Sequence, residues 1–316
     1  MDLSIIIVNW NVCELLQSCL ESIYDTITGL KFEIIIVDNA SQDKSAEMIK
    51  SRFSGVTLVE NKINAGFAAS NNQAMSIAKG RYYLLLNPDT RVLDNAIVKT
   101  IEFANEHANA AITVCKVLDA DGTLQPNCFT YPSACNFFLL GTYLNKLFAK
   151  NRFFGRERLT WWGYDNIRSV EAVTGCFMLL RKEAVDQIGG LDERFFMYAE
   201  EMDWCYRFTR AGWKIMFTPD SAIIHYGHKS SDQLPAEMIL QPGLSKLRFV
   251  QKHKGAMEYI LSCFFLGLFY LLRIPYWMTI AILSEKKKKN ALVKVKTYAV
   301  GVCRACEMTL KFSNKK

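Results

Sequence analysis

The chain has 316 residues, enough for one large domain or two smaller ones, and half of them are hydrophobic, which is too few for a polytopic membrane protein. Its net charge is +7, and much of that charge lies after residue 245. Interleaved aromatic and basic signatures of RNA binding are absent, so the composition excludes a nucleic-acid partner and favours an anionic membrane surface.

Short apolar runs and helical periodicities alternate through the first 90 residues. The expected elements are, in chain order, a strand at 3–8, a helix at 12–24, a strand at 32–37, a helix at 44–53 capped by Ser41, a strand at 56–60, a helix at 67–79 and a strand at 82–86. This alternation predicts an α/β fold whose sheet is mostly parallel, with right-handed crossovers. The N-terminus, MDLSIIIV, has no basic region and only a short apolar run, so we do not expect a signal peptide and expect the catalytic candidates to face the cytosol.

Polar residues follow three of the four strands. Asn9 comes after the first strand, Asp38 after the second, and Asn87-Pro88-Asp89 after the fourth. The carboxyl ends of parallel strands meet at one edge of a sheet, where open α/β sheets bind ligands, so these residues predict a nucleotide-type crevice. Because the chain contains neither a GxGxxG nor a Walker A sequence, a dinucleotide site and a P-loop are disfavoured.

The remaining elements are less regular. We expect a helix at 94–108, a strand at 111–118, an irregular aromatic region at 119–170, a strand at 170–181, a short helix at 182–188, a segment rich in carboxylates and aromatics at 192–210, and a strand at 215–224 that ends at His225.

Seven stretches of the sequence carry a resemblance. They are SIIIVNWN, IIIVDNAS, NKINAGFAASNN, LLLNPDT, VTGCFMLLRKEA, GGLDERFFMYAEEMDWCYR and IIHYGHKSS, and together they cover roughly residues 1–231. In this order the sequence resembles the family 2 glycosyltransferases of the GT-A fold, particularly rhamnosyltransferase-like bacterial enzymes that build surface polysaccharides. The resemblance implies a GT-A, Rossmann-like catalytic domain at 1–245, with a nucleotide-sugar-binding half at 1–118 and an acceptor-binding half at 119–245.

The resemblance also implies a set of donor-binding residues. They are Val8, Asn9, Asp38, Asn64, Gly66, Phe67 and Asn87. Asp38 could accept a hydrogen bond from the ring N–H of a uracil or thymine, and its alternative role is to cap the following turn. Gly66 matches a loop that lines the donor, where close backbone approach or a positive φ is needed, and the alternative is an ordinary turn.

Asn87-Pro88-Asp89 resembles the family's metal-binding DxD motif. By this resemblance Asp89 would bind Mg²⁺ or Mn²⁺ on the donor diphosphate, while Asn87 would orient the donor. His225 matches a histidine that can reach the same metal, and imidazole suits Mn²⁺ better than Mg²⁺. The alternative for His225 is a histidine packed at a strand end.

The acids Glu200, Glu201 and Asp203 resemble the family's ED-x-D element, which supplies the general base. The usual base position falls on Glu201, where Asp is common, so which of the three acids is the base stays open. Crowded carboxylates raise one another's pKa, which suits a proton acceptor, whereas the alternative is a solvated acidic helix start. A single carboxylate base without a covalent nucleophile implies inversion at the anomeric carbon.

The acceptor residues implied are Gly175, Cys176, Trp161 and Trp162. Aromatic faces can stack on sugar C–H surfaces, but aromatic side chains at this density are as often part of a core.

Residues 259–283 are almost wholly apolar, but Arg273 and Pro275 interrupt the run, and lysines flank it on both sides. The pattern favours a broken hairpin or an in-plane helix over one clean span, with a buried helix pair as the alternative. We expect residues 246–316 to form a membrane-associated helical region that, with 136–150, docks on the inner leaflet and presents a lipid-linked acceptor.

The ten cysteines are scattered through expected strands and helices, in a chain much larger than a disulfide scaffold, so we expect them to be reduced. Cys303 and Cys306 form a C-x-x-C pair without a second pair or a neighbouring His, which disfavours a zinc site.

The resemblance, together with the basic and apolar C-terminal region, implies a glycosyltransferase at the cytoplasmic face of the cell membrane. It would use a nucleotide-sugar donor such as dTDP-rhamnose, a divalent metal and a lipid-linked saccharide acceptor. The alternatives are a UDP-hexose or UDP-N-acetylhexosamine donor, a non-catalytic nucleotide-sugar-binding subunit, and a nucleotidyltransferase.

Overall fold

A computed structural model describes residues 1–227 and 236–313. The chain divides into two compact units. The first comprises Met1–Thr130 and Trp162–Gln233, and the second comprises Tyr131–Trp161 and Leu234–Lys316. The expected boundary near residue 245 therefore differs from the observed division, because residues 131–161 group with the C-terminal helices.

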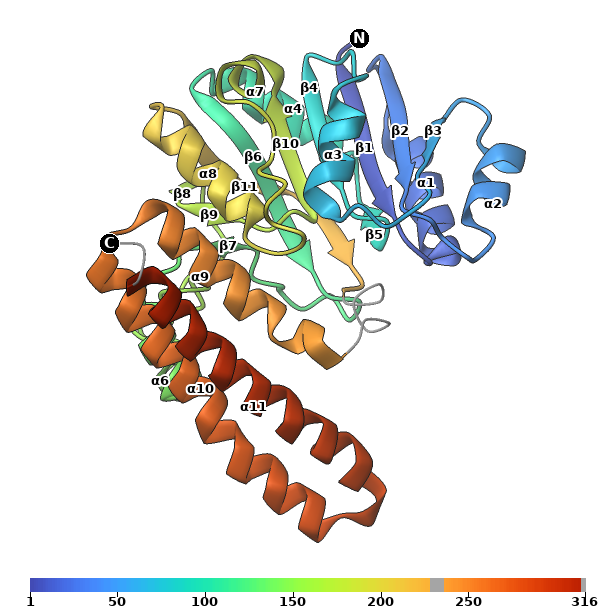
Figure 1. Ribbon diagram of the computed structural model, residues 1–316. Coiled ribbons are helices and arrows are strands. Elements are labelled where there is room, and N and C mark those ends of the chain that lie inside the picture. Colours follow the sequence, from blue (N-terminus) through green and yellow to red (C-terminus); the bar gives the residue numbers. More distant parts are fainter. Residues whose placement is uncertain (228–235, 314–316) are drawn as a thin grey trace. The chain divides into compact units, whose positions relative to one another are not determined.

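The first unit is built on a nine-stranded sheet (Figure 1), in the order β3-β2-β1-β4-β10-β6-β11-β5, with β8 paired to β11. Its strands are β1 (Leu3–Asn9), β2 (Phe32–Asp38), β3 (Thr57–Glu60), β4 (Tyr82–Leu86), β5 (Thr90–Val92), β6 (Ala110–Leu118), β8 (Arg168–Val170), β10 (Phe177–Arg181) and β11 (Lys214–His225). The first four strands along this order are parallel, as predicted, whereas β10 runs antiparallel to both β4 and β6.

Helices cover this sheet and make the expected crossovers. They are α1 (Cys13–Thr26), α2 (Ser45–Arg52), α3 (Phe67–Met75), α4 (Ala96–Glu106), α7 (Lys182–Ile188) and α8 (Glu200–Arg210). A small second sheet pairs β7 (Cys128–Phe129) with β9 (Ala172–Val173). Ser41 does not cap α2; Asp43 instead accepts hydrogen bonds from the Ser45 N–H and hydroxyl.

The core explains why the strands read as continuous apolar runs. Every residue of β4 is buried, and neighbouring residues of β1 and β2 are buried on both faces of the sheet. Asn9 pairs in register with Asp38, so the polar ends of β1 and β2 lie side by side. The ten cysteines form no disulfide, as predicted, and six of them are buried.

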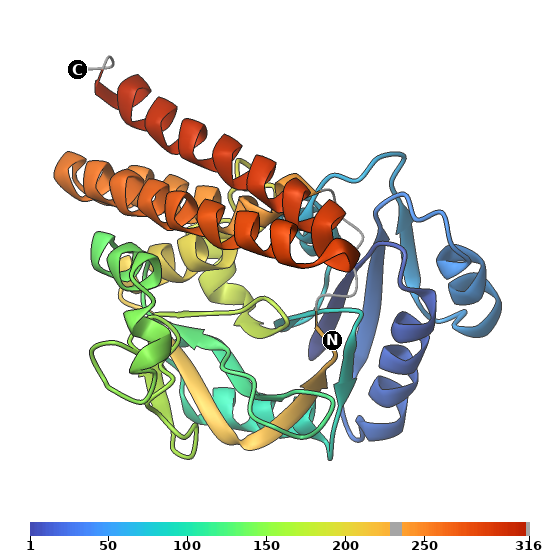
Figure 2. The same ribbon diagram turned by 90° about the horizontal axis from the view of Figure 1, so that it is seen from below.

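The second unit is helical. Its helices are α5 (Ala134–Gly141), α6 (Leu144–Leu147), α9 (Gln241–His253), α10 (Ala256–Leu283) and α11 (Glu285–Ser313), with a 3₁₀ turn at Ala236–Ile239. In both views α10 and α11 run side by side as a hairpin joined at Ser284 (Figures 1 and 2). By length and composition, α10 could cross a membrane.

Residues 131–161 group with these helices because α5 packs on α10. The Ala134 N–H donates to the Glu258 carboxylate at 2.8 Å, and the rings of Phe138 and Phe265 meet edge to face at 5.2 Å. The Cβ position of Gly141 lies 3.4 Å from the Phe265 carbonyl oxygen, an ordinary van der Waals distance between two packed helices. The apolar residues of α5 thus find their partners on α10.

Of the two arrangements predicted for residues 259–283, the broken hairpin is wrong, because α10 is one continuous helix, whereas the in-plane helix stays a prediction. The Arg273 guanidinium donates to the Phe269 carbonyl at 2.8 Å and lies over the rings of Phe269 and Tyr143, so this cation is satisfied within the second unit. Pro275 removes one helix hydrogen bond, but the helix continues on both sides of it.

Replacing Pro275 with Ala tests this continuity. Since an interior proline costs about 3 kcal/mol relative to alanine, Pro275→Ala should raise the thermal unfolding midpoint of the purified protein. Pro242 is the matched control, because it lies in the first turn of α9, where proline is tolerated. If both substitutions have the same effect, α10 is not an intact helix at Pro275.

Candidate functional site

The ends of β1 and β2 form one hydrogen-bonded unit. Asn9 Nδ2 donates to Asp38 Oδ2 at 2.8 Å, and the Ser41 N–H donates to Asp38 Oδ1 at 2.9 Å. Asp38 thus does cap the following turn, and each of its oxygens retains a further acceptor position. Asn9 and Asp38 are both buried, which fixes these polar groups at the carboxyl edge of the sheet.

Asn39, which was not among the expected site residues, ties this edge to the next loop. Its Oδ1 accepts from the Ser70 hydroxyl at 2.7 Å and from Asn61 Nδ2 at 2.9 Å. Buried amides that are fully hydrogen-bonded make a rigid loop. Its only sequence signal was its place directly after Asp38.

Gly66 shows both features expected of it. Its φ is +85°, and a Cβ there would lie 2.6 Å from the Phe196 carbonyl oxygen. That oxygen accepts from the Phe67 N–H at 3.2 Å, and Asn64 Oδ1 accepts from the Gly66 N–H at 3.0 Å. Only glycine fits this close approach at a positive φ.

Asp89 and His225 lie together, although they are far apart in the sequence. Strand β11 pairs with β5, so His225 lies opposite Thr90, and its Nε2 is 3.2 Å from Asp89 Oδ1. Asn87 Nδ2 lies 3.3 Å from the same nitrogen. Asp89 and His225 are largely buried, with side chains 7% and 15% exposed.

Gln125 orients the histidine. Its Nε2 donates to Asp119 Oδ1 at 2.5 Å, so its Oε1 is the acceptor that faces His225 Nδ1 at 2.7 Å. The hydrogen-bond network thus assigns the proton to Nδ1, and in the neutral ring Nε2 carries a lone pair. A lone pair on Nε2 and the Asp89 carboxylate then face each other, an arrangement that a cation between them would stabilise.

The donor set at this position fits a hard divalent metal only in part. Within the described ranges 1–227 and 236–313, no group of three or more His, Cys, Asp or Glu residues could hold a metal ion. Mg²⁺ and its relatives are commonly held by one or two protein ligands together with substrate phosphates. Asp89 and His225 therefore fit a metal site that a bound diphosphate would complete.

The three acids at the start of α8 have different surroundings. Tyr198 and Ala199 enter the helix with φ of +67° and +64°, an unusual backbone for non-glycine residues. Glu200 is buried, and burial together with the Glu201 carboxylate raises the pKa of Glu200 well above its usual range. Glu201 is half-buried.

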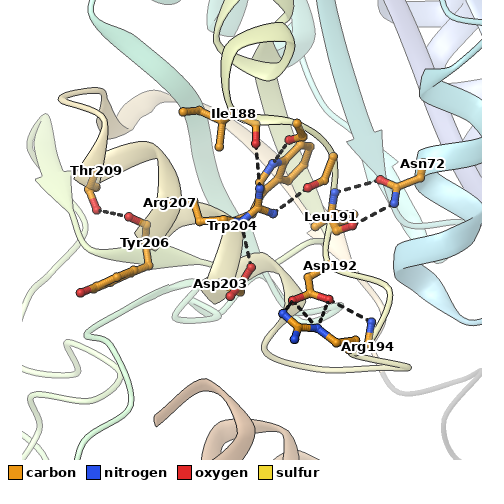
Figure 3. Close-up of polar contacts among 12 residues, drawn as sticks. Asn72, Ile188, Leu191, Asp192, Arg194, Asp203, Trp204, Tyr206, Arg207 and Thr209 are labelled. Atoms are coloured by element: carbon orange, nitrogen blue, oxygen red, sulfur yellow. Dashed lines mark hydrogen bonds and ion pairs between the residues drawn. The ribbon is translucent and has the colours of Figure 1, made fainter. Parts of the chain in front are cut away.

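Asp203 is fully buried, and its carboxylate accepts from Arg207 Nε at 2.9 Å (Figure 3). A buried carboxylate that is committed to a guanidinium has a structural role, so the geometry does not suit Asp203 as a general base. The i, i+4 spacing of Asp203 and Arg207 was a sequence signal for this pair.

Helix α8 is anchored to the end of α7. Trp204 Nε1 donates to the Gly189 carbonyl at 2.8 Å, and Arg207 donates to the carbonyls of Ile188 at 3.1 Å and Gly190 at 2.6 Å (Figure 3). These bonds hold the acid-bearing first turn at a fixed place in the first unit.

The four residues expected to bind the acceptor do not lie together in one site. Gly175 lies against the Phe67 ring, with a Cβ position 3.0 Å from its Cζ, and the Cys176 carbonyl accepts from the Asn87 N–H. Burial raises the pKa of the Cys176 thiol to about 12, which makes this thiol a packing group. Trp162 is 6% exposed and stacks on Tyr164 at 4.2 Å, so it is a core residue. Trp161 belongs to the second unit, where Arg152 lies over its ring.

Comparisons with known proteins agree with these observations. The model of the family described as Glycosyl transferase family 2 matches residues 4–189. An N-acetylglucosaminyl-diphospho-decaprenol L-rhamnosyltransferase of Mycobacterium tuberculosis is 25% identical over 237 residues, which cover 70% of this chain and 76% of that protein. Rhamnosyltransferase WbbL of Escherichia coli K12 is 26% identical over 208 residues, 62% of this chain and 74% of that protein.

A solved structure shares the fold. The mannosyltransferase PcManGT from Pyrobaculum calidifontis, in complex with GDP-Man and Mn²⁺, aligns with a TM-score of 0.58 at 13% identity, over 98% of this chain and 86% of that one. The expected GT-A fold is confirmed.

The raised pKa of Glu200 predicts a pH-dependent stability. The folded state binds this proton more tightly than the unfolded chain, so the group stabilises the fold below the unfolded pKa of about 4.3, and that contribution is lost as pH rises through the raised folded pKa. Glu200→Gln should therefore raise the free energy of unfolding at pH 8 by about 1–3 kcal/mol and have little effect near pH 4.

Urea unfolding at several pH values measures this difference. Glu47→Gln is the control, because Glu47 is an exposed glutamate in the first turn of α2. A stability gain for Glu200→Gln that is equal at pH 4 and pH 8 would contradict the assignment.

Proposed function

The chain belongs to glycosyl transferase family 2, and from that premise we propose that it transfers rhamnose from dTDP-rhamnose to a lipid-linked saccharide during cell-surface polysaccharide biosynthesis. The observation that carries the proposal is the placement of Asp89 beside His225 Nε2 at the carboxyl end of the sheet. The M. tuberculosis and E. coli relatives are both named as rhamnosyltransferases, which supports the choice of rhamnose.

The donor would lie along the carboxyl edge of β1, β2 and β4. Val8, Asn9 and Asp38 would hold the nucleobase and ribose, with a remaining acceptor position of Asp38 directed at the base N–H. Asn64, Gly66 and Phe67 would line the donor, and Asn87 would orient its diphosphate. Carboxylate and amide groups fixed in advance in this way bind a polar ligand with little reorganisation.

Asp89 and His225 would hold a divalent cation, for which imidazole favours Mn²⁺ over Mg²⁺. When bound, the metal supplies positive charge that neutralises the departing diphosphate. Gln125 Oε1 would accept a hydrogen bond from the Nδ1–H of His225 and so keep Nε2 available as the ligand atom.

Glu201 would act as the general base. The acceptor hydroxyl oxygen attacks the anomeric carbon, its bond to the diphosphate oxygen breaks, and the hydroxyl proton passes to the Glu201 carboxylate. One displacement of this kind inverts the anomeric carbon. Burial and the neighbouring Glu201 carboxylate raise the pKa of Glu200, so the proposal assigns the base role to Glu201, the less buried of the two acids.

The second unit would bring the enzyme to the cytoplasmic face of the membrane, where lipid-linked acceptors reside. Large apolar side chains of α10 are exposed along its length, including Met257, Phe264, Leu271 and Ile282. Lysines 286–289 follow at the tip of the hairpin and would contact anionic headgroups. The name of the M. tuberculosis relative, which specifies a decaprenol-diphosphate substrate, supports this acceptor class.

Replacing the proposed metal ligands should abolish the response to Mn²⁺. Asp89→Ala and His225→Ala should lower transfer by at least about 100-fold, and Gln125→Ala should weaken Mn²⁺ binding by about 10- to 100-fold. Measuring the transfer rate and the affinity for dTDP at increasing Mn²⁺ concentrations gives both the loss of transfer and the change in Mn²⁺ binding.

His107→Ala is the control, because that histidine stacks on Phe103 in α4. Undiminished Mn²⁺ dependence in the Asp89 and His225 variants would remove these residues as ligands.

Glu201→Gln should lower kcat by about 10²- to 10⁴-fold, since it removes the proton acceptor, while dTDP still binds with wild-type affinity. Transfer of labelled rhamnose from dTDP-rhamnose to a lipid-linked saccharide is the measurement. Glu200→Gln, which keeps a neutral group at the neighbouring position, should retain far more activity. Equal losses in the two variants, or none in Glu201→Gln, would rule out Glu201 as the base.

A further inference from the structure

Asn72 joins α3 to the segment that leads into the acids. Its Nδ2 donates to the Leu191 carbonyl at 2.9 Å, and its Oδ1 accepts from the Leu191 N–H at 2.9 Å (Figure 3). One side-chain amide thus pairs with both backbone groups of one residue, as a strand partner would. The same Nδ2 donates to Glu193 Oε1 at 2.9 Å.

The fit around Asn72 is close. A Cβ on Gly190 would collide with Asn72 Oδ1, although the φ of Gly190 does not itself require glycine. Glycine at this position therefore serves the approach of the amide. A contact in which both partners are shaped for each other defines the position of the segment more strictly than a single hydrogen bond does.

Residues 189–199 form a loop that is held at three places. Its first residues are held by α8, because Trp204 and Arg207 bind the carbonyls of Gly189 and Gly190. Its middle contacts the proposed donor turn through the bond from the Phe67 N–H to the Phe196 carbonyl. Asn72, one and a half turns along α3 from Phe67, holds the third place, Leu191.

We propose that Asn72 is a positioning residue that couples the donor-lining turn at Gly66 and Phe67 to the placement of Glu201. Helix α3 begins at that turn, so a nucleotide that orders the turn also orders α3 and, through Asn72, the loop 189–199 that precedes α8. The inference rests on the proposed function, because it takes the Gly66 turn as the donor side and Glu201 as the base.

Two variants disturb the contact from opposite sides. Asn72→Leu keeps a side chain of similar shape but removes the hydrogen bonds to Leu191 and Glu193. Gly190→Ala adds a methyl group at the position that the Asn72 amide occupies. Both should lower kcat about 10- to 100-fold, as a displaced catalytic group does, while the dTDP dissociation constant stays at its wild-type value. Gln73→Leu, at the next and exposed position of α3, is the control.

Hydrogen exchange of the full-length protein with and without dTDP tests the coupling itself. In the wild type and in Gln73→Leu, dTDP should slow exchange in both 64–72 and 189–199. In the two variants the slowing should be lost around Leu191 but remain near Phe196, whose carbonyl still accepts from the Phe67 N–H. Variants that unfold at a lower temperature but keep the wild-type kcat and the slowing around Leu191 would show a purely structural Asn72 and overturn the inference.

Failure of the donor proposal gives a different result. In that case neither dTDP nor UDP slows exchange in 64–72 of the wild type. If a nucleotide does slow 64–72 but leaves 189–199 unchanged in the wild type, the donor site stands and the coupling through Asn72 is refuted.

Discussion

The contact between Asp89 and His225 is the constraint on which the rest of the site depends. Gln125 holds the imidazole with its protonated nitrogen turned away, so a lone pair and a carboxylate face each other at 3.2 Å. Asn87 Nδ2 also faces His225 Nε2 at 3.3 Å, and positive charge beside the pair would further stabilise two acceptors at this distance. Both side chains are largely buried, which strengthens electrostatic interactions at the site, and a divalent cation on a bound diphosphate would supply this charge.

The acids of α8 illustrate how one short segment assigns different roles to similar groups. Asp203 is committed to Arg207 and thereby to the anchoring of the helix. Glu200 is buried with a raised pKa, and Glu201 is the more accessible of the two glutamates. The left-handed residues Tyr198 and Ala199 that precede them store backbone strain, a feature that recurs at functional sites.

Much of the first unit could be predicted from the sequence, because its determinants are local. The apolar runs of β1, β2 and β4 and the polar residues after them are contiguous, so a mostly parallel sheet and a polar edge followed from general rules for α/β sheets. The partnership of Asp89 with His225 is not local, and only the resemblance to a known family indicated it. Gln125 lies in an irregular region without any pattern to mark it.

Other features depend on contacts that no local pattern records. Residues 131–161 group with α10 because of Glu258 and Phe265, which lie more than a hundred residues later. Pro275 left a broken hairpin and a continuous in-plane helix both open from the sequence, and the structure shows a continuous helix in which Arg273 bonds the Phe269 carbonyl. Trp161 and Trp162 are adjacent in sequence but belong to different units, so aromatic density alone could not distinguish an acceptor platform from a core.

The most direct test of the account is the location of manganese in a crystal of the protein grown with dTDP and Mn²⁺. Anomalous diffraction at the manganese edge should show one strong peak within bonding distance of Asp89 and His225 Nε2, next to the diphosphate. A manganese peak that contacts the diphosphate but neither of these side chains would contradict the account.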